Sequence, residues 1–113
     1  AYYLQAQKVR TVIAKEFDRE LKGLDAILTP STPHPAFKIG AKSDPLAMYL
    51  EDIFMSGASL AGLPAMSIPA GFTEDLPIGM QLIGQRFNEA TLFKVGHAYQ
   101  QATTWHTRRA NIN

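Results

Sequence analysis

The sequence contains no cysteine, which excludes disulfide bonds and thiolate metal sites and fits a reducing compartment. No apolar run approaches the roughly 20 residues that a membrane-spanning helix needs. An excess of one charge is absent as well, because 11 basic residues against 10 acidic ones leave a net charge of +1. The Arg108–Arg109 pair is too small to form a nucleic-acid-binding patch. A phosphate-binding loop and a dinucleotide-binding fingerprint are also missing.

The 113 residues have the length of one domain, and a hydrophobic content of 46% is ordinary for a globular protein. The chain opens at Ala1, already inside a helical pattern and without a start methionine. We therefore expect residues 1–113 to be a single segment of a longer chain, with no internal domain boundary.

Two short apolar runs near the middle predict a pair of buried strands, at 65–70 and 78–84. The connection at 71–77 is too short for a parallel crossover, which needs about a dozen residues, so the strands are expected to be antiparallel neighbours. Gly79 and Gly84 leave room for a close approach, and we expect a helix to pack there.

The remaining elements follow from apolar periodicity and from capping residues. They are a helix at 2–22 ended by Gly23, a buried strand at 25–30, a helix from Ser43-Asp44-Pro45 to about Met55, and a helix from Glu89 to about Ala102 capped by Asn88. A second, shorter helical turn is expected to end at Gly62, and Trp105 is expected to anchor the tail. The fold class is therefore α/β, a mixed β-sheet flanked by helices, with about three helices and three strands. The first two strands could run parallel, and the small sheet with two open edges suggests a piece of a larger one.

The residue types that carry catalysis form no recognisable constellation. None of the serines lies in a Gly-x-Ser-x-Gly motif or has a lysine at a suggestive spacing. The histidines His34, His97 and His106 lie on three separate elements without metal-ligand spacing, so no metal site is expected. His34, between two prolines, is expected on a surface loop. From its own residues we predict no catalytic residue in this chain.

One carboxylate stands out on the helix that begins at Asp44. Glu51 and Asp52 are consecutive and point about 100° apart, and Asp52 shares its face with Met48 and Met55. Burying an unpaired charge is unfavourable, so Asp52 is either exposed or matched to a cation. Helix geometry leaves both alternatives open.

Six segments, in order along nearly the whole chain, resemble the C-terminal quarter of amidase signature family proteins. They are AYYLQAQKVRT at 1–11, DAILTPSTP at 25–33, DPLAMYLEDIF at 44–54, LAGLPAMSIPAGF at 60–72, LPIGMQLIGQRFNEATL at 76–92 and WH at 105–106. The DPLAMYLEDIF segment is similar to one branch of the family, the glutaminase subunits of tRNA-dependent amidotransferases.

This resemblance implies a fragment of the amidase signature fold and an enzyme that hydrolyses glutamine through two serines and a lysine. Those three residues belong to a signature that this chain lacks, so the 113 residues alone are expected to be inactive. The released ammonia would amidate Glu-tRNA(Gln) or Asp-tRNA(Asn). The implied partners are companion subunits B and C, with ATP and Mg²⁺ bound by one of these companions. Aminoacyl-tRNA would be bound through the complex, with no membrane involved, in the bacterial cytoplasm or an organelle.

One site residue carries over from the family pattern. Asp52 matches the acidic residue that such subunits use to hold the α-ammonium group of glutamine, which favours the cation-matched alternative. Two other functions stay open: a fragment of another amide hydrolase of the same family, and a non-catalytic interaction module. The DPLAMYLEDIF segment argues against the former, and the missing serines and lysine favour the latter for the isolated chain.

Overall fold

The computed structural model describes residues 2–41 and 44–110, and Ser43 of the predicted helix start lies outside them. The elements in chain order are α1 (Tyr2–Glu20), β1 (Ile27–Pro30), α2 (Pro45–Glu51), α3 (Ser56–Ala61), β2 (Ala65–Thr73), β3 (Leu76–Ile83), α4 (Glu89–Ala102) and a short 3-10 helix (Trp105–Thr107). This is the predicted α/β class, and α3 is the second, shorter helical turn that was expected to end at Gly62.

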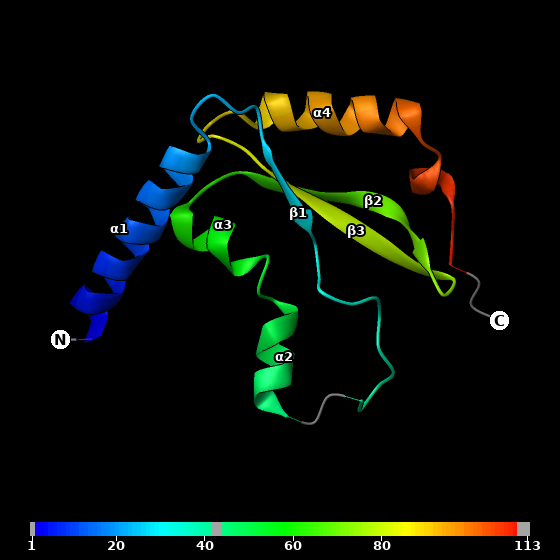
Figure 1. The fold of residues 1–113 in the computed structure, drawn as a ribbon, viewed down its shortest axis with the longest axis horizontal. Helices are drawn as coiled ribbons and strands as arrows, with labels where there is room; N and C mark the ends of the chain where they lie inside the picture. Colours follow the sequence, from blue (N-terminus) through cyan, green and yellow to red (C-terminus); the bar gives the residue numbers. More distant parts are fainter. Residues whose placement is uncertain (1, 42–43, 111–113) are drawn as a thin grey trace.

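The three strands form one sheet in the order β1-β3-β2, with β3 antiparallel to both neighbours. β1 and β2 therefore run in the same direction, as anticipated, but β3 lies between them (Figure 1). The predicted antiparallel hairpin is confirmed, although its strands are longer than expected. Glu74 and Asp75 both have positive φ, 50° and 63°, so they close a two-residue turn and let pairing continue to Thr73 and Leu76.

Helices cover the two faces of this sheet unequally. On one face, α4 packs Leu92 against Ile68 and Leu82, which are buried. On the other face, α1 and α3 pack around Ile83 at one end of the sheet. Gly84 behaves as expected, since an added Cβ would lie 3.0 Å from the Leu92 side chain of α4.

Two predictions about burial and helix length were wrong. β1 is not a buried strand, because it is an edge strand that α4 leaves uncovered, and Leu28 is 61% exposed. The helix that begins at Pro45 ends at Glu51 rather than near Met55. The backbone amides of the next two residues bond three residues back, Asp52 to the Tyr49 carbonyl and Ile53 to the Leu50 carbonyl. The α-helical hydrogen-bond spacing is therefore lost at this point.

The helix termini otherwise follow the sequence signals. Gly62 directly follows α3 with a φ of 68°, and Gly23, also with a positive φ of 80°, closes the turn that follows Glu20 at the end of α1. Asn88 precedes α4 as predicted, but its side chain accepts a hydrogen bond from the Thr91 hydroxyl (2.7 Å) instead of capping a backbone N–H. Trp105 docks beside Phe72 with ring centroids 6.4 Å apart, which confirms the anchored tail.

The described chain is flat and spread out, with extents of 51 × 39 × 16 Å. Its radius of gyration is 16.4 Å, against about 13 Å for a compact domain of this length. Figure 1 shows why: α1 and α2 project from the sheet in separate directions. Much apolar surface on these two helices consequently faces solvent.

Candidate functional site

The candidate site begins where α2 ends. Asp44 starts this helix by accepting hydrogen bonds from the backbone amides of Leu46 (3.3 Å) and Ala47 (3.2 Å), and Pro45 occupies the first turn. Seven residues later α2 stops, and Asp52 is its C-terminal capping residue. A tight turn at 52–55 then leads directly into α3.

Asp52 lies exposed on an open groove. The groove has a volume of about 430 Å³, and its lining residues are Asp52, Met55, Ser56, Ser59 and Leu60. Within residues 2–41 and 44–110, the Asp52 carboxylate has no hydrogen-bond or ion-pair partner. Because its neighbours in the groove are apolar side chains and serine hydroxyls, the carboxylate is available to bind a cationic group from outside this chain.

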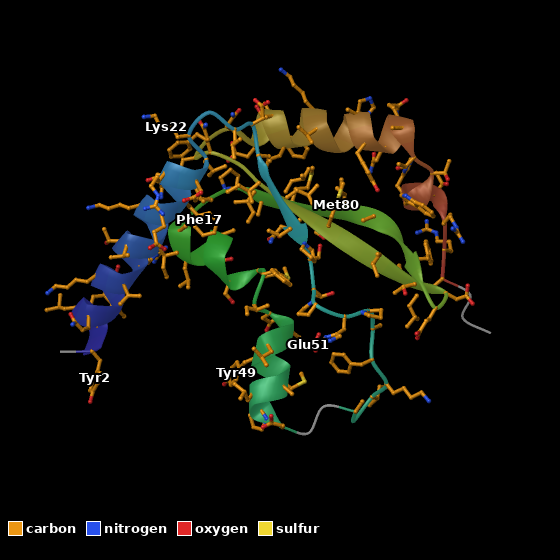
Figure 2. The ribbon with its side chains drawn as sticks, in the orientation of Figure 1. Tyr2, Phe17, Lys22, Tyr49, Glu51 and Met80 are labelled. Atoms are coloured by element: carbon orange, nitrogen blue, oxygen red, sulfur yellow. The ribbon has the colours of Figure 1, made fainter. Side chains whose placement is uncertain are left out.

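Glu51, the preceding residue, has a different environment. Its side chain is only 12% exposed, and its Oε1 lies 3.2 Å from Nδ1 of His34. Figure 2 shows Glu51 on the side of α2 that faces the proline-containing loop. His34 is on the surface as predicted, with a side chain 63% exposed. These two consecutive carboxylates therefore have different environments. Glu51 connects α2 to the loop that contains His34, whereas Asp52 faces a groove.

A second depression, of about 270 Å³, adjoins this groove and shares Met55 and Ser59 with it. Ser67 and Gln81 contribute its polar groups from the sheet. Sequence reasoning passed over Gln81, which is 4% exposed. The available signal was its place as a polar residue inside the apolar run at 78–84.

Two serines meet on the same face of the sheet. The Oγ atoms of Ser31 and Ser67 are 2.5 Å apart, above Gly79, whose missing side chain leaves them room. An added Cβ at Gly79 would lie 2.8 Å from Ser31 Oγ. The space beside Gly79 is therefore occupied by these two serine hydroxyls and not by the helix that was expected to pack there. These hydroxyls bond to each other, so in the described chain neither is activated by a histidine or lysine.

A further depression lies at the C-terminal end of α1 and is lined by Asp18 and Arg86 among others. Arg86 Nη1 is 2.5 Å from an Asp18 carboxylate oxygen, and its Nη2 donates to the Ala61 carbonyl (2.8 Å). Gln85 donates to the carbonyl of Leu21 (3.3 Å). These groups hold α1 and α3 to the end of β3, so this depression is a structural junction and not the candidate site.

His97 and His106 are both exposed and lie on separate elements. Across the described residues, no group of three or more His, Cys, Asp or Glu side chains is arranged to hold a metal ion. The described helices also include none that is long and apolar enough to cross a membrane. Asp52, the residue predicted to bind substrate, is one of the residues that line the groove.

Comparison with known proteins gives consistent matches along the chain. The amidase family model matches residues 1–93. The A subunit of the glutamyl-tRNA(Gln) amidotransferase of Geobacter metallireducens is 57% identical over 99% of this chain and 24% of that protein. The chain thus spans about a quarter of the length of such relatives.

Solved structures agree with this relationship. The crystal structure of the A subunit of glutamyl-tRNA(Gln) amidotransferase from Thermotoga maritima matches with a TM-score of 0.87 and 48% identity, over 91% of this chain and 23% of that one. A peptide amidase from Stenotrophomonas maltophilia matches with a TM-score of 0.76 and 27% identity, over 98% of this chain and 21% of that one. The backbone arrangement is shared by both, and the sequence is nearer to the former.

Proposed function

Because this chain belongs to the amidase family, we propose that it is the C-terminal segment of the glutaminase subunit of a tRNA-dependent amidotransferase. The complete subunit would hydrolyse glutamine and supply the ammonia that converts Glu-tRNA(Gln) or Asp-tRNA(Asn) to the amidated form. Residues 1–113 would provide scaffold and part of the substrate pocket, within one domain.

The observation that carries this proposal is the extent of the match to one kind of relative. Identity of 57% to the amidotransferase protein of Geobacter metallireducens runs along 99% of the chain. The peptide amidase, whose name gives it another substrate, is only 27% identical although it covers as much of the chain. The difference supports a glutamine-hydrolysing protein over another amide hydrolase of the family.

The chemical role we propose for this segment is the binding of the glutamine α-ammonium group by Asp52. An exposed carboxylate that has no partner among the described residues, and that lines a groove, suits a cationic ligand group. The covalent chemistry requires an activated nucleophile, and the Ser31–Ser67 pair has no base beside it. We therefore place the nucleophile and its base in the part of the subunit that lies outside residues 1–113.

The proposed partners follow from the same assignment. Companion subunits B and C would bind the complete subunit, and a companion would bind ATP and Mg²⁺ to activate the tRNA-linked carboxylate. Aminoacyl-tRNA would be bound through the complex and not by this segment, whose net charge is only +1. The bacterial cytoplasm would be the site of this reaction.

The test is a chimera in which this chain replaces the matching quarter of the Thermotoga maritima protein. Asp52→Asn keeps the shape of the side chain and removes its charge. A charge-assisted hydrogen bond is worth roughly 1.5–3 kcal/mol, so KM for glutamine should rise about ten- to a hundredfold. Amide transfer from free ammonia, measured with the companion subunits present, should be nearly unchanged because it bypasses the glutamine site.

Asp25→Asn is the matched control, since Asp25 is also exposed and lies on the loop before β1, away from the groove. It should leave KM for glutamine unchanged. Glu51→Gln is not a suitable control, because Glu51 is mostly buried and pairs with His34. A wild-type KM in Asp52→Asn would remove Asp52 from the substrate site, and a parallel loss of both activities would make it a structural residue.

A further inference from the structure

Gln81 is the buried polar side chain of the described core, with an exposure of 4%. It lies on β3, on the sheet face opposite α4, because its neighbour Leu82 is the residue that packs against Leu92. A buried amide needs hydrogen-bond partners, since leaving such a group unpaired costs about 1–3 kcal/mol. Its partners therefore show what holds it in place.

The partners of the Gln81 amide determine which of its two end atoms is the nitrogen. Its Nε2 lies 2.7 Å from the backbone carbonyl oxygen of Phe54 and 3.2 Å from Oγ1 of Thr29. A carbonyl oxygen can only accept, so the group that faces it must be the amide nitrogen. Gln81 therefore donates a short hydrogen bond from the sheet to the main chain of the 52–55 turn.

That turn is a compact unit built on Asp52. The Asp52 carbonyl accepts hydrogen bonds from the amides of Met55 (3.0 Å) and Ser56 (3.2 Å) and from the Ser56 hydroxyl (3.1 Å). Within the described chain, the bond from Gln81 to Phe54 is the one hydrogen bond that connects this turn to the sheet. α3 follows this turn directly and packs near Ile83, and Gln81 adds the hydrogen bond that joins the turn itself to the sheet. The position of Asp52 therefore depends in part on Gln81.

We propose that Gln81 is a positioning residue that sets the location of Asp52 and thereby the affinity for the ammonium group of the substrate. This inference rests on the proposed function of Asp52. Gln81 is also adjacent to the site, because the depression that it lines shares Met55 and Ser59 with the Asp52 groove. Displacement of the turn would move the carboxylate without changing its charge, so the effect should fall on KM and not on kcat.

The experiment is a double-mutant cycle in the chimera with the Thermotoga maritima protein. Gln81→Met keeps the length of the side chain and removes the donor, and it should raise KM for glutamine about three- to tenfold with little change in kcat. If Gln81 acts through Asp52, adding Gln81→Met to Asp52→Asn should raise KM no further. Thr29→Val is the control, because it removes the longer contact and leaves the Phe54 bond, and its KM should stay within about twofold of wild type.

Hydrogen exchange supplies a second readout that a general loss of structure would not reproduce. Gln81→Met should speed exchange at the Met55 and Ser56 amides by about tenfold, while the amides that pair β3 with its neighbours keep their protection. If Gln81→Met does not yield soluble protein, Gln81→Leu takes its place in the same cycle. That variant fills most of the same space and has no group that can donate to the Phe54 carbonyl.

The outcomes separate the two proposals. A raised KM in Asp52→Asn with a wild-type KM in Gln81→Met, or with effects that add, overturns the positioning role and leaves the Asp52 assignment intact. A wild-type KM in Asp52→Asn overturns the Asp52 assignment, and the inference about Gln81 falls with it. Uniformly faster exchange across the sheet would make Gln81 an ordinary core residue.

Discussion

Two regions of this chain use apolar residues in different ways. One is the sheet together with α4, and the other is α2, which projects from the sheet as an exposed arm. In the sheet region Leu82 and Ile83 are each 2% exposed, and helices pack on both faces. On α2, apolar residues recur at helical spacing just as clearly, yet Leu46 is 64% and Tyr49 is 76% exposed. Figure 2 shows Tyr49 on the side of α2 opposite Glu51 and the proline-containing loop.

The difference shows that an apolar stripe predicts a buried face without identifying what buries it. For the sheet the partner is α4, within the same chain. For α2 the described residues supply no comparable cover, so its apolar side chains stay exposed in this chain. Asp52 lies at the boundary of these regions, on the turn that joins the exposed arm to the packed part.

The largest expected effect contrasts a side chain from each region. Leu82→Ala should lower the free energy of unfolding by about 2–5 kcal/mol, because it removes a fully buried side chain and leaves a cavity. Leu50→Ala on α2 removes the same atoms from a residue that is already 50% exposed, so the loss should stay below about 1 kcal/mol. Urea denaturation of each variant measures both values.

The stability losses of Leu82→Ala and Leu50→Ala can also be compared in the chimera with the Thermotoga maritima protein. If the upstream part of the subunit covers α2, the cost of Leu50→Ala should rise towards that of Leu82→Ala there, while the cost of Leu82→Ala stays the same. Equal costs for the two variants in the isolated chain would contradict the distinction between a packed sheet and an exposed arm.

A smaller effect is expected at the serine pair on the sheet. Gly79→Ala places a Cβ 2.8 Å from Ser31 Oγ and 3.2 Å from Ser67 Oγ, so the hydroxyls must separate, at a cost of about 1–3 kcal/mol. Adding Ser31→Ala removes the nearest atom and should recover part of the loss. Thermal denaturation of the single and double variants checks this, and strictly additive costs would argue against the clash.

The sequence predicted the elements whose signals are local. The period of α1, the apolar runs of the hairpin and the asparagine before α4 all act over a few residues. Each of these elements formed close to its predicted position, although α1 is shorter and the hairpin strands are longer than expected. The resemblance to the amidase family was confirmed by the match over residues 1–93. The role of Asp52 stays a prediction.

The features that were missed depend on contacts between distant residues. α2 ends at Glu51 because the backbone amides that follow bond to carbonyls three residues back. The Phe54 carbonyl in that turn accepts a hydrogen bond from Gln81, which is 27 residues away in the sequence. Exposure of β1 depends on which part of the sheet α4 covers. Pairing of Ser31 with Ser67 needs both strands aligned on β3 over a glycine. No local pattern carries such information.

The smallest expected effect concerns the tail, which docks on the sheet through an aromatic contact. The Arg108 guanidinium carbon lies 4.5 Å from the ring centroid of Phe72 and 5.4 Å from that of Trp105. A cation–π contact at an exposed site is worth about 0.5–1 kcal/mol, so Arg108→Gln should lower stability by about that amount. Arg109→Gln removes the same charge from a neighbour with no ring contact in the described chain, and it should change stability less. Because the chain has one tryptophan, the fluorescence of Trp105 during urea denaturation reports the docking directly. Equal losses for both variants would mean that general electrostatics, and not stacking on Phe72 and Trp105, holds the tail in place.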